Sequence, residues 1–148
     1  MTDRELMQAA IALAREAAAD GEVPVGAVVT RNGEIVSVGR NRREKDKNAL
    51  AHAEIEAIDR ACKALGGWRL WECELFVTLE PCPMCAGAIS QARVSRLVYG
   101  AHDPKQGCAG SVYRICEDPA FSHFCPSDGG TLEDECRALL NRFFESHR

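Results

Sequence analysis

The sequence predicts an α/β domain in which helices cover both faces of a mixed central sheet. Two observations carry this prediction. Short apolar segments typical of strands alternate with longer segments of helical periodicity along the 148 residues. No internal repeat or Gly/Ser-rich linker divides them, and the length suits one ordinary domain, so we expect residues 1–148 to form a single domain.

Local signals justify the elements in order. Thr2-x-x-Glu5 is a capping box that opens a helix closing near Gly21. Asn32-Gly33 predicts the turn of a hairpin between two apolar runs, residues 25–30 and 34–38. The polar residues 40–50 are expected to form a loop. The remaining expected elements are helices over residues 51–65, 83–91 and 133–144, strands over 74–79 and 94–99, and a glycine-containing loop over 102–111.

Composition narrows the class of protein. A hydrophobic content of 46% with 27% charged residues is typical of a soluble globular chain, and no apolar run reaches membrane length. No signal-peptide pattern opens the sequence, so the eight cysteines are interpreted as thiols in a reducing cytoplasm. The net charge of −4 gives no global attraction to nucleic acid. Residues 31–47 are nevertheless basic and residues 117–135 acidic, which indicates either solvated surfaces or a local basic patch beside a site.

The residues that carry chemistry are His52-Ala53-Glu54 and Pro81-Cys82-Pro83-Met84-Cys85, which together read H-x-E…P-C-x-x-C. This pattern is the signature of zinc deaminases. Three protein ligands leave the fourth position of a tetrahedral zinc ion for water, as catalytic sites require. We therefore predict that His52, Cys82 and Cys85 bind one Zn²⁺ per subunit.

Glu54 need not bind the metal, and its predicted role is to carry a proton between water, substrate and leaving group. Each half of the pattern has a plainer interpretation by itself. A Cys-x-x-Cys pair also occurs in redox centres and in structural zinc sites, and His-x-Glu alone has little meaning. The joint pattern, with strand, turn and helix around the cysteines, favours a catalytic zinc site.

With these residues in place, the chain resembles the cytidine/deoxycytidylate deaminase superfamily and, within it, the bacterial tRNA-specific adenosine deaminases. The zinc motif identifies only the superfamily, whereas longer stretches indicate the narrower family. These stretches are residues 21–29, 51–55, 68–70, 77–88, 99–103 and 107–111. The resemblance implies a three-layer cytidine-deaminase-like fold and conversion of a wobble adenosine of tRNA to inosine. It also implies a cytoplasmic homodimer that contacts the anticodon stem-loop, with no membrane partner.

The resemblance also implies a substrate site. Backbone atoms at Ala53 and Glu80 would help to close the base pocket. Asp103 and Lys105 would face the flanking nucleotides, although Asp-Pro-Lys is equally a solvated turn. The other implied substrate residues are Val23, Pro24 and Asn41 in the base pocket and Phe144 as a stacking aromatic. Asn41 could instead cap a loop, and one of Phe143 and Phe144 is expected to pack in the core.

Three features depart from the family pattern. Asn48-Ala49-Leu50 replaces the usual Asp-Pro-Thr, and the chain ends at Arg148 without a Lys/Arg-rich tail, which predicts weaker non-specific attraction to RNA. In residues 124–130, where relatives have an apolar strand, one proline and two glycines argue against a strand. Trp68 and Trp71 are interpreted as structural anchors between helix and strand rather than as stacking platforms.

Two other functions therefore stay open. One is a deaminase of a free base, nucleoside or nucleotide, of the guanine or cytosine type, which needs no basic surface. The other is a zinc-stabilised binding module without catalysis. Glu54 discriminates against the binding module, because a structural site has no use for a proton carrier beside its metal.

Overall fold

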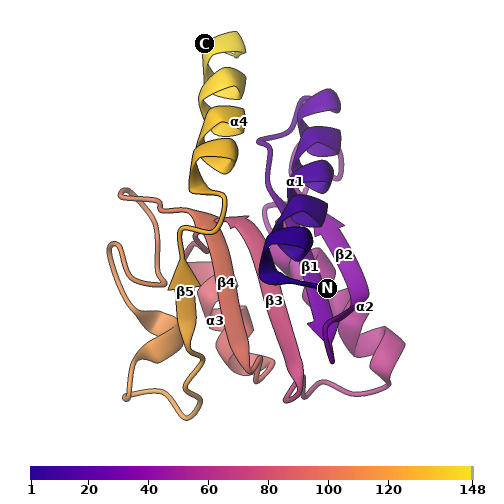
Figure 1. Ribbon diagram of the computed structural model, residues 1–148, viewed down its shortest axis with the longest axis vertical. Helices are drawn as coiled ribbons and strands as arrows, with labels where there is room; N and C mark the ends of the chain where they lie inside the picture. Colours follow the sequence, from indigo (N-terminus) through magenta and orange to yellow (C-terminus); the bar gives the residue numbers. More distant parts are fainter. Residues whose placement is uncertain (148) are drawn as a thin grey trace.

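The computed structural model of the chain has three layers, with a five-stranded sheet between two pairs of helices (Figure 1). It describes residues 1–147. The elements are α1 (Asp3–Ala19), β1 (Gly26–Arg31), β2 (Glu34–Arg40), α2 (Ala53–Leu65), β3 (Cys73–Leu79), α3 (Pro83–Gln91), β4 (Arg96–Ala101), the 3-10 helix η1 (Ile115–Glu117), β5 (Ser127–Gly129) and α4 (Glu133–Ser146).

The sheet is mixed, with strand order β2-β1-β3-β4-β5. β1 runs antiparallel to both of its neighbours, β2 and β3, whereas β3, β4 and β5 are parallel to one another. The expected hairpin turn joins β1 to β2, and both of its residues have positive φ, 53° at Asn32 and 74° at Gly33. As a result β2 and β3 run in the same direction and end at the same edge of the sheet.

Apolar residues alternate between two cores, one on each face of the sheet. Val28 and Phe76 face the core shared with α1 and α4, whereas Val29 and Leu75, one position along each strand, face the core shared with α2 and α3. Figure 1 shows α1 and α4 on one side of the sheet and α2 and α3 on the other. The predicted α/β class, with a mixed sheet covered on both faces, is confirmed.

Several expected boundaries differ by two residues from the observed ones, and for two of them the local backbone gives the reason. α2 begins at Ala53 rather than at residue 51, because His52 has the extended backbone of an N-cap, with φ −82° and ψ 155°. β4 begins at Arg96 rather than at residue 94, since Arg93 has a positive φ of 62° that interrupts the chain between α3 and the strand. All eight cysteines are free thiols, as expected.

Residues 124–130 do contain a strand, contrary to the prediction from their proline and glycines, because Ser127–Gly129 forms β5 beside β4. Pro126 lies just before the strand, and its carbonyl accepts the N–H of Leu97 at 2.9 Å, so the missing proline N–H removes nothing from the ladder. A Cβ on Gly129 would lie 2.4 Å from the Tyr99 ring. Glycine therefore permits the close approach of β5 to that aromatic side chain.

Among residues 1–147, no helix combines the length and the apolar character that crossing a bilayer requires.

Gly39 in β2 allows α2 to lie close against the sheet. A Cβ there would meet the carbonyl oxygen of Ala53 at 2.2 Å and the amide nitrogen of Ala57 at 2.7 Å, and both of these are backbone atoms that cannot rotate away. The first turn of α2 carries Glu54 and follows His52 directly. The spacing between strand and helix thus sets the position of both residues.

Gly39→Ala is therefore expected to lower the free energy of unfolding by about 1–3 kcal/mol, because the added methyl group forces α2 away from β2. Urea denaturation measures the loss. Gly87→Ala in α3 is the matched control, since a Cβ there has no atom within 4 Å. That control should gain about 0.5–1 kcal/mol from helix propensity. Equal stabilities of the two variants would contradict the close contact between β2 and α2.

Candidate metal centre and active site

The metal-binding motif comes together because two helices begin at one edge of the sheet. β2 and β3 both end there, and the chain leaves each strand to enter a helix. His52 is the N-cap of α2, and Cys82 is the N-cap of α3, with Pro83 in the first turn as predicted. Cys85 lies one turn into α3. Residues thirty positions apart in the sequence thus face each other across the end of β3.

The three side chains have the spacing of a metal site. The Nδ1 atom of His52 lies 3.6 Å from Cys82 Sγ and 3.4 Å from Cys85 Sγ, and all three atoms lie within 4.8 Å of one another. Bonds of the lengths that zinc makes to nitrogen and sulfur would set these atoms about 3.6 Å apart at a tetrahedral angle. The donor set therefore fits a tetrahedral ion of that size. Among residues 1–147 this is the one group of three such ligands.

The pKa values of the two thiols are shifted in opposite directions. Hydrogen bonding by Cys85, and then by His52, lowers the pKa of Cys82 to about 4. The same pairing, together with burial, raises the pKa of Cys85. The pairing thus favours the thiolate at Cys82 and the protonated thiol at Cys85. A metal ion that binds both sulfurs must displace the Cys85 proton, so binding releases it to solvent.

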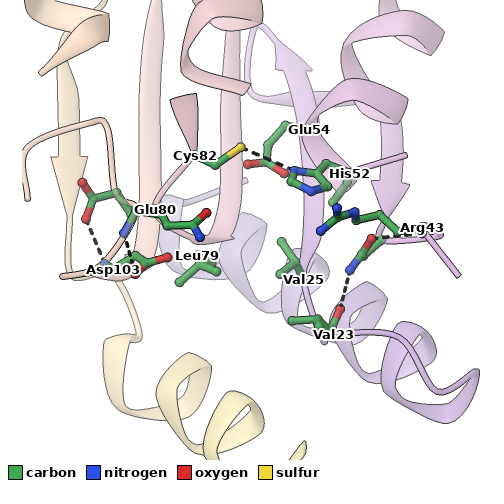
Figure 2. Close-up of a pocket in the computed structure, with 12 residues that line it drawn as sticks. Val23, Val25, Arg43, His52, Glu54, Leu79, Glu80, Cys82 and Asp103 are labelled. Carbon is green, nitrogen blue, oxygen red and sulfur yellow. Dashed lines mark hydrogen bonds between the residues drawn. The ribbon is translucent and has the colours of Figure 1, made fainter. Parts of the chain in front are cut away.

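Glu54 is the buried acid beside this group. Its side chain is only 4% exposed, yet it lines the same pocket as His52 and Cys82 (Figure 2). Burial raises the pKa of Glu54 to about 7. The carboxyl is not one of the three clustered ligands. The Glu54 carboxyl thus lines the pocket beside the three clustered side chains without being one of them.

The pocket is apolar on its walls and polar at its base and rim (Figure 2). Such a lining can hold a flat heterocyclic base and still offer a few hydrogen-bonding groups to orient it. The lining residues are Val23, Val25, Asn41, Arg43, His52, Ala53, Glu54, Leu79, Glu80, Cys82, Asp103 and Gln106.

Most residues implied for substrate binding lie in or beside this pocket. Asn41 lines it while also holding the loop, because its amide donates to the Val23 carbonyl at 3.3 Å and accepts the Arg43 N–H at 3.2 Å. Asn41 therefore both lines the pocket and caps the loop, so the two interpretations of this residue are compatible. Val23, Ala53 and Asp103 also line the pocket.

Three implied residues lie outside it. Lys105 and Phe144 line a second cleft, which shares Val23, Leu79, Asp103 and Gln106 with the first. Phe144 is 53% exposed, as a stacking role requires. Pro24 is buried and does not line the pocket; its neighbours Val23 and Val25 do so instead.

The two tryptophans are not buried anchors, since Trp68 is 51% and Trp71 56% exposed. Neither lines the pocket that holds Glu54. Trp68 instead packs beside the guanidinium of Arg69, which lies 4.1 Å from its ring centre. Structural anchoring between helix and strand therefore stays a prediction, and a stacking role in this pocket has no support from the position of either residue.

Sequence reasoning missed Val25, Arg43, Leu79 and Gln106 as lining residues. For Arg43 a signal existed, because it lies in the basic run before His52. That run holds several cations, however, and the sequence pattern does not tell which of them lines the pocket. Leu79 and Gln106 have no distinguishing residue type, so only the fold brings them to the site.

The side chain of Glu80 was also missed, and it holds the loop that forms one wall of the pocket. Its carboxylate is 2% exposed and accepts the backbone N–H groups of Asp103 at 2.9 Å, Ala109 at 3.1 Å and Ser111 at 2.9 Å, together with the Ser111 hydroxyl. Burial opposes its ionisation, but these hydrogen bonds outweigh burial and hold the pKa of Glu80 below its usual value. Gly107 lies so close that a Cβ would meet Glu80 Cδ at 2.3 Å.

Glu80→Gln is expected to loosen this loop, because an amide NH₂ replaces one acceptor oxygen and faces backbone donors. We expect a loss of about 1–3 kcal/mol in the free energy of unfolding. Amide hydrogen exchange should accelerate at Asp103, Ala109 and Ser111. The exposed Glu34→Gln is the control and should change neither quantity. Unchanged exchange at all three amides in Glu80→Gln would show that the carboxylate does not hold the loop.

Comparisons with known proteins agree with this geometry. Residues 1–119 match the family described as MafB19-like deaminase. The tRNA-specific adenosine deaminase of Bacillus subtilis (strain 168) is 49% identical, over 100% of this chain and 92% of the relative. A solved structure from a study of A-to-I editing by tRNA:A34 deaminases superposes with a TM-score of 0.88 at 43% identity, over 92% of this chain and 99% of that one.

Guanine deaminase from Nitrosomonas europaea shares the fold at lower identity, with a TM-score of 0.82 at 27% identity over 95% of this chain and 83% of that one. Both structures thus have the same architecture, but the identity is higher for the tRNA deaminase and extends over nearly all of both chains. The chain therefore belongs to the deaminase family and, within it, to the tRNA-specific adenosine deaminases.

Proposed function

We propose that the protein is a zinc-dependent hydrolytic deaminase that converts the wobble adenosine of a tRNA anticodon to inosine. The main evidence for the tRNA substrate is the 49% identity, over the whole chain, to the Bacillus subtilis tRNA-specific adenosine deaminase. The reaction class is supported by three metal ligands and one buried carboxyl in a single pocket that can hold a base. Residues 1–148 would act as one deaminase domain.

Zinc is the metal that this donor set favours. Two thiolates and one imidazole suit a borderline-soft ion, and hydrolysis requires no redox change. His52, Cys82 and Cys85 would hold it. Bound zinc lowers the pKa of a water molecule toward neutrality, which makes a nucleophile available without a strong base.

Glu54 would serve as the proton carrier. Water adds to C6 of adenine, and the C6–N bond then breaks to release ammonia and leave the keto base. Both protons of the water molecule are transferred, one to the ring nitrogen N1 and one to the departing amine. A single buried carboxyl at the base of the pocket can perform these transfers in turn.

The neighbouring residues would orient the base and the strand that carries it. Val23 and Leu79 offer apolar walls, and Asn41 an amide, to the target base. Lys105 and Phe144, in the adjoining cleft, would meet a phosphate and a splayed base of a flanking nucleotide. We also infer a homodimer and a cytoplasmic site of action, where the anticodon stem-loop is available.

A deaminase of a free base remains the alternative function. The shared fold with a guanine deaminase favours it, as does a net charge of −4 that gives no global attraction to RNA. Inosine formation on an anticodon stem-loop with a wobble adenosine tests the two, with free adenosine, cytidine, cytosine and guanine assayed in parallel for ammonia release. Inosine in the stem-loop alone supports the proposal. Turnover of a free base with an untouched stem-loop would overturn it.

Replacement of a metal ligand is expected to lower both the zinc content and the stability of the protein, because the free energy of metal binding contributes to the free energy of folding. In His52→Ala and in Cys82→Ala we expect almost complete loss of bound zinc by elemental analysis, with a lower midpoint of thermal unfolding. Cys62→Ala is the control, since this half-buried thiol lies outside the ligand group. Full metal occupancy in both ligand variants would refute the assignment.

Loss of the Glu54 carboxyl should lower the rate of deamination without lowering the stability of the fold. In Glu54→Ala we expect zinc content and unfolding midpoint close to those of the parent, but turnover lower by about 10²–10⁴-fold, the usual contribution of a positioned acid–base group. Single-turnover inosine formation measures it. Asp59→Asn, which changes a carboxylate on the same helix outside the pocket, should keep full activity. Parent-like turnover in Glu54→Ala would rule out the proton-carrier role.

A further inference from the structure

Arg43 is one of two cations in its basic segment, with Lys47, that have no carboxylate partner among residues 1–147. Of the five cations between residues 40 and 47, three form ion pairs within the chain. Among residues 1–147, no carboxylate lies within ion-pair distance of the Arg43 guanidinium. Arg40 pairs with Asp20 at 3.0 Å and with Glu16 at 4.0 Å, Arg42 pairs with Glu56 at 2.8 Å, and Lys45 pairs with Asp20 at 3.9 Å.

Arg43 is also the cation that reaches the active site. It is the only arginine or lysine among the twelve described residues that line the pocket, and Figure 2 shows its guanidinium pointing toward His52. The remaining unpaired cation of the segment, Lys47, is exposed like Arg43 but lines neither of the two adjoining clefts. The structure thus selects one cation from the basic run.

The backbone that carries Arg43 is fixed before any substrate arrives. Its N–H donates to the Asn41 side chain at 3.2 Å. The next two residues are held by Glu22, a carboxylate that is 2% exposed and accepts the N–H groups of Glu44 at 3.1 Å and Lys45 at 2.8 Å. Because the loop is already ordered, binding through Arg43 costs only the freedom of its own side chain.

The chemistry of a guanidinium identifies what it can bind. It carries five N–H donors in a planar fork that matches the oxygens of a phosphate. A free purine base or nucleoside is neutral and gives such a cation nothing to neutralise. A nucleotide within a strand brings a phosphate on each side of its sugar, close to the mouth of any pocket that accepts its base.

We propose that Arg43 binds the RNA backbone phosphate adjacent to the target nucleotide, and that this contact favours a polynucleotide over a free base or nucleoside. The inference rests on the proposed function and deepens it. It assigns the discrimination between substrate classes to one positioned side chain at the rim of the pocket.

The test compares Arg43→Gln with Lys47→Gln, which removes the same charge from the same loop. We expect Arg43→Gln to raise KM for the anticodon stem-loop about tenfold, as expected for one charge-assisted hydrogen bond, with kcat little changed. The slope of log KM against log salt should fall by about 0.7, as for one neutralised phosphate of a single strand. Lys47→Gln should leave KM near the parent value, and Arg43→Lys should recover part of the loss.

Stem-loops with a neutral methylphosphonate at the linkage 5′ or 3′ of the wobble nucleotide identify the contact. At one of these positions, the parent protein and Arg43→Gln should have equal KM values, because the phosphate that Arg43 would contact is already replaced by a neutral group. An undiminished penalty with both neutral linkages, or equal effects of Arg43→Gln and Lys47→Gln, would overturn the inference while the parent still forms inosine. Failure of the proposed function is distinct, since the parent itself would then leave the stem-loop unchanged.

Discussion

The antiparallel placement of β1 between β2 and β3 is the constraint on which the site depends. Because β1 opposes both neighbours, these two strands end at one edge and send α2 and α3 off from the same place. Two helix N-termini directed at one cation would repel it, since each carries about half a positive charge. In the proposed zinc site, the sulfurs of Cys82 and Cys85 as thiolates would supply the compensating negative charge. A cation would therefore be held there only when these two cysteines are ionised.

Two buried carboxylates give the pocket its fixed walls. Glu22 holds the loop that carries Arg43, and Glu80 holds the loop that carries Asp103. Each accepts backbone N–H groups that would otherwise be unsatisfied away from water, which offsets the cost of burying a charge. Both walls are therefore ordered by the protein itself, so a base that enters the pocket meets groups already in position.

The sequence predicted those parts of the molecule in which a residue type has only one common use. Asn32-Gly33 indicated the hairpin, and the spacing of His52, Cys82 and Cys85 indicated the metal ligands, because few other arrangements use these residues in that pattern. The sequence could not show that Gly129 serves a strand by accommodating Tyr99, or that Arg43 lines the pocket. Both outcomes depend on contacts between segments far apart in the chain, which local pattern does not encode.

The location of charge explains how a chain of net charge −4 can bind a polyanion. The acidic run of residues 117–135 spans η1, β5 and the start of α4, whereas the basic residues 40–47 follow β2 at the opposite edge of the sheet. Four strand spacings separate β2 from β5, roughly 19 Å. Charges at that distance are largely screened at physiological salt, where the Debye length is about 8 Å. The basic residues beside the pocket are therefore screened from the acidic residues on β5, and Arg43 would be the cation nearest to an RNA strand whose base enters the pocket.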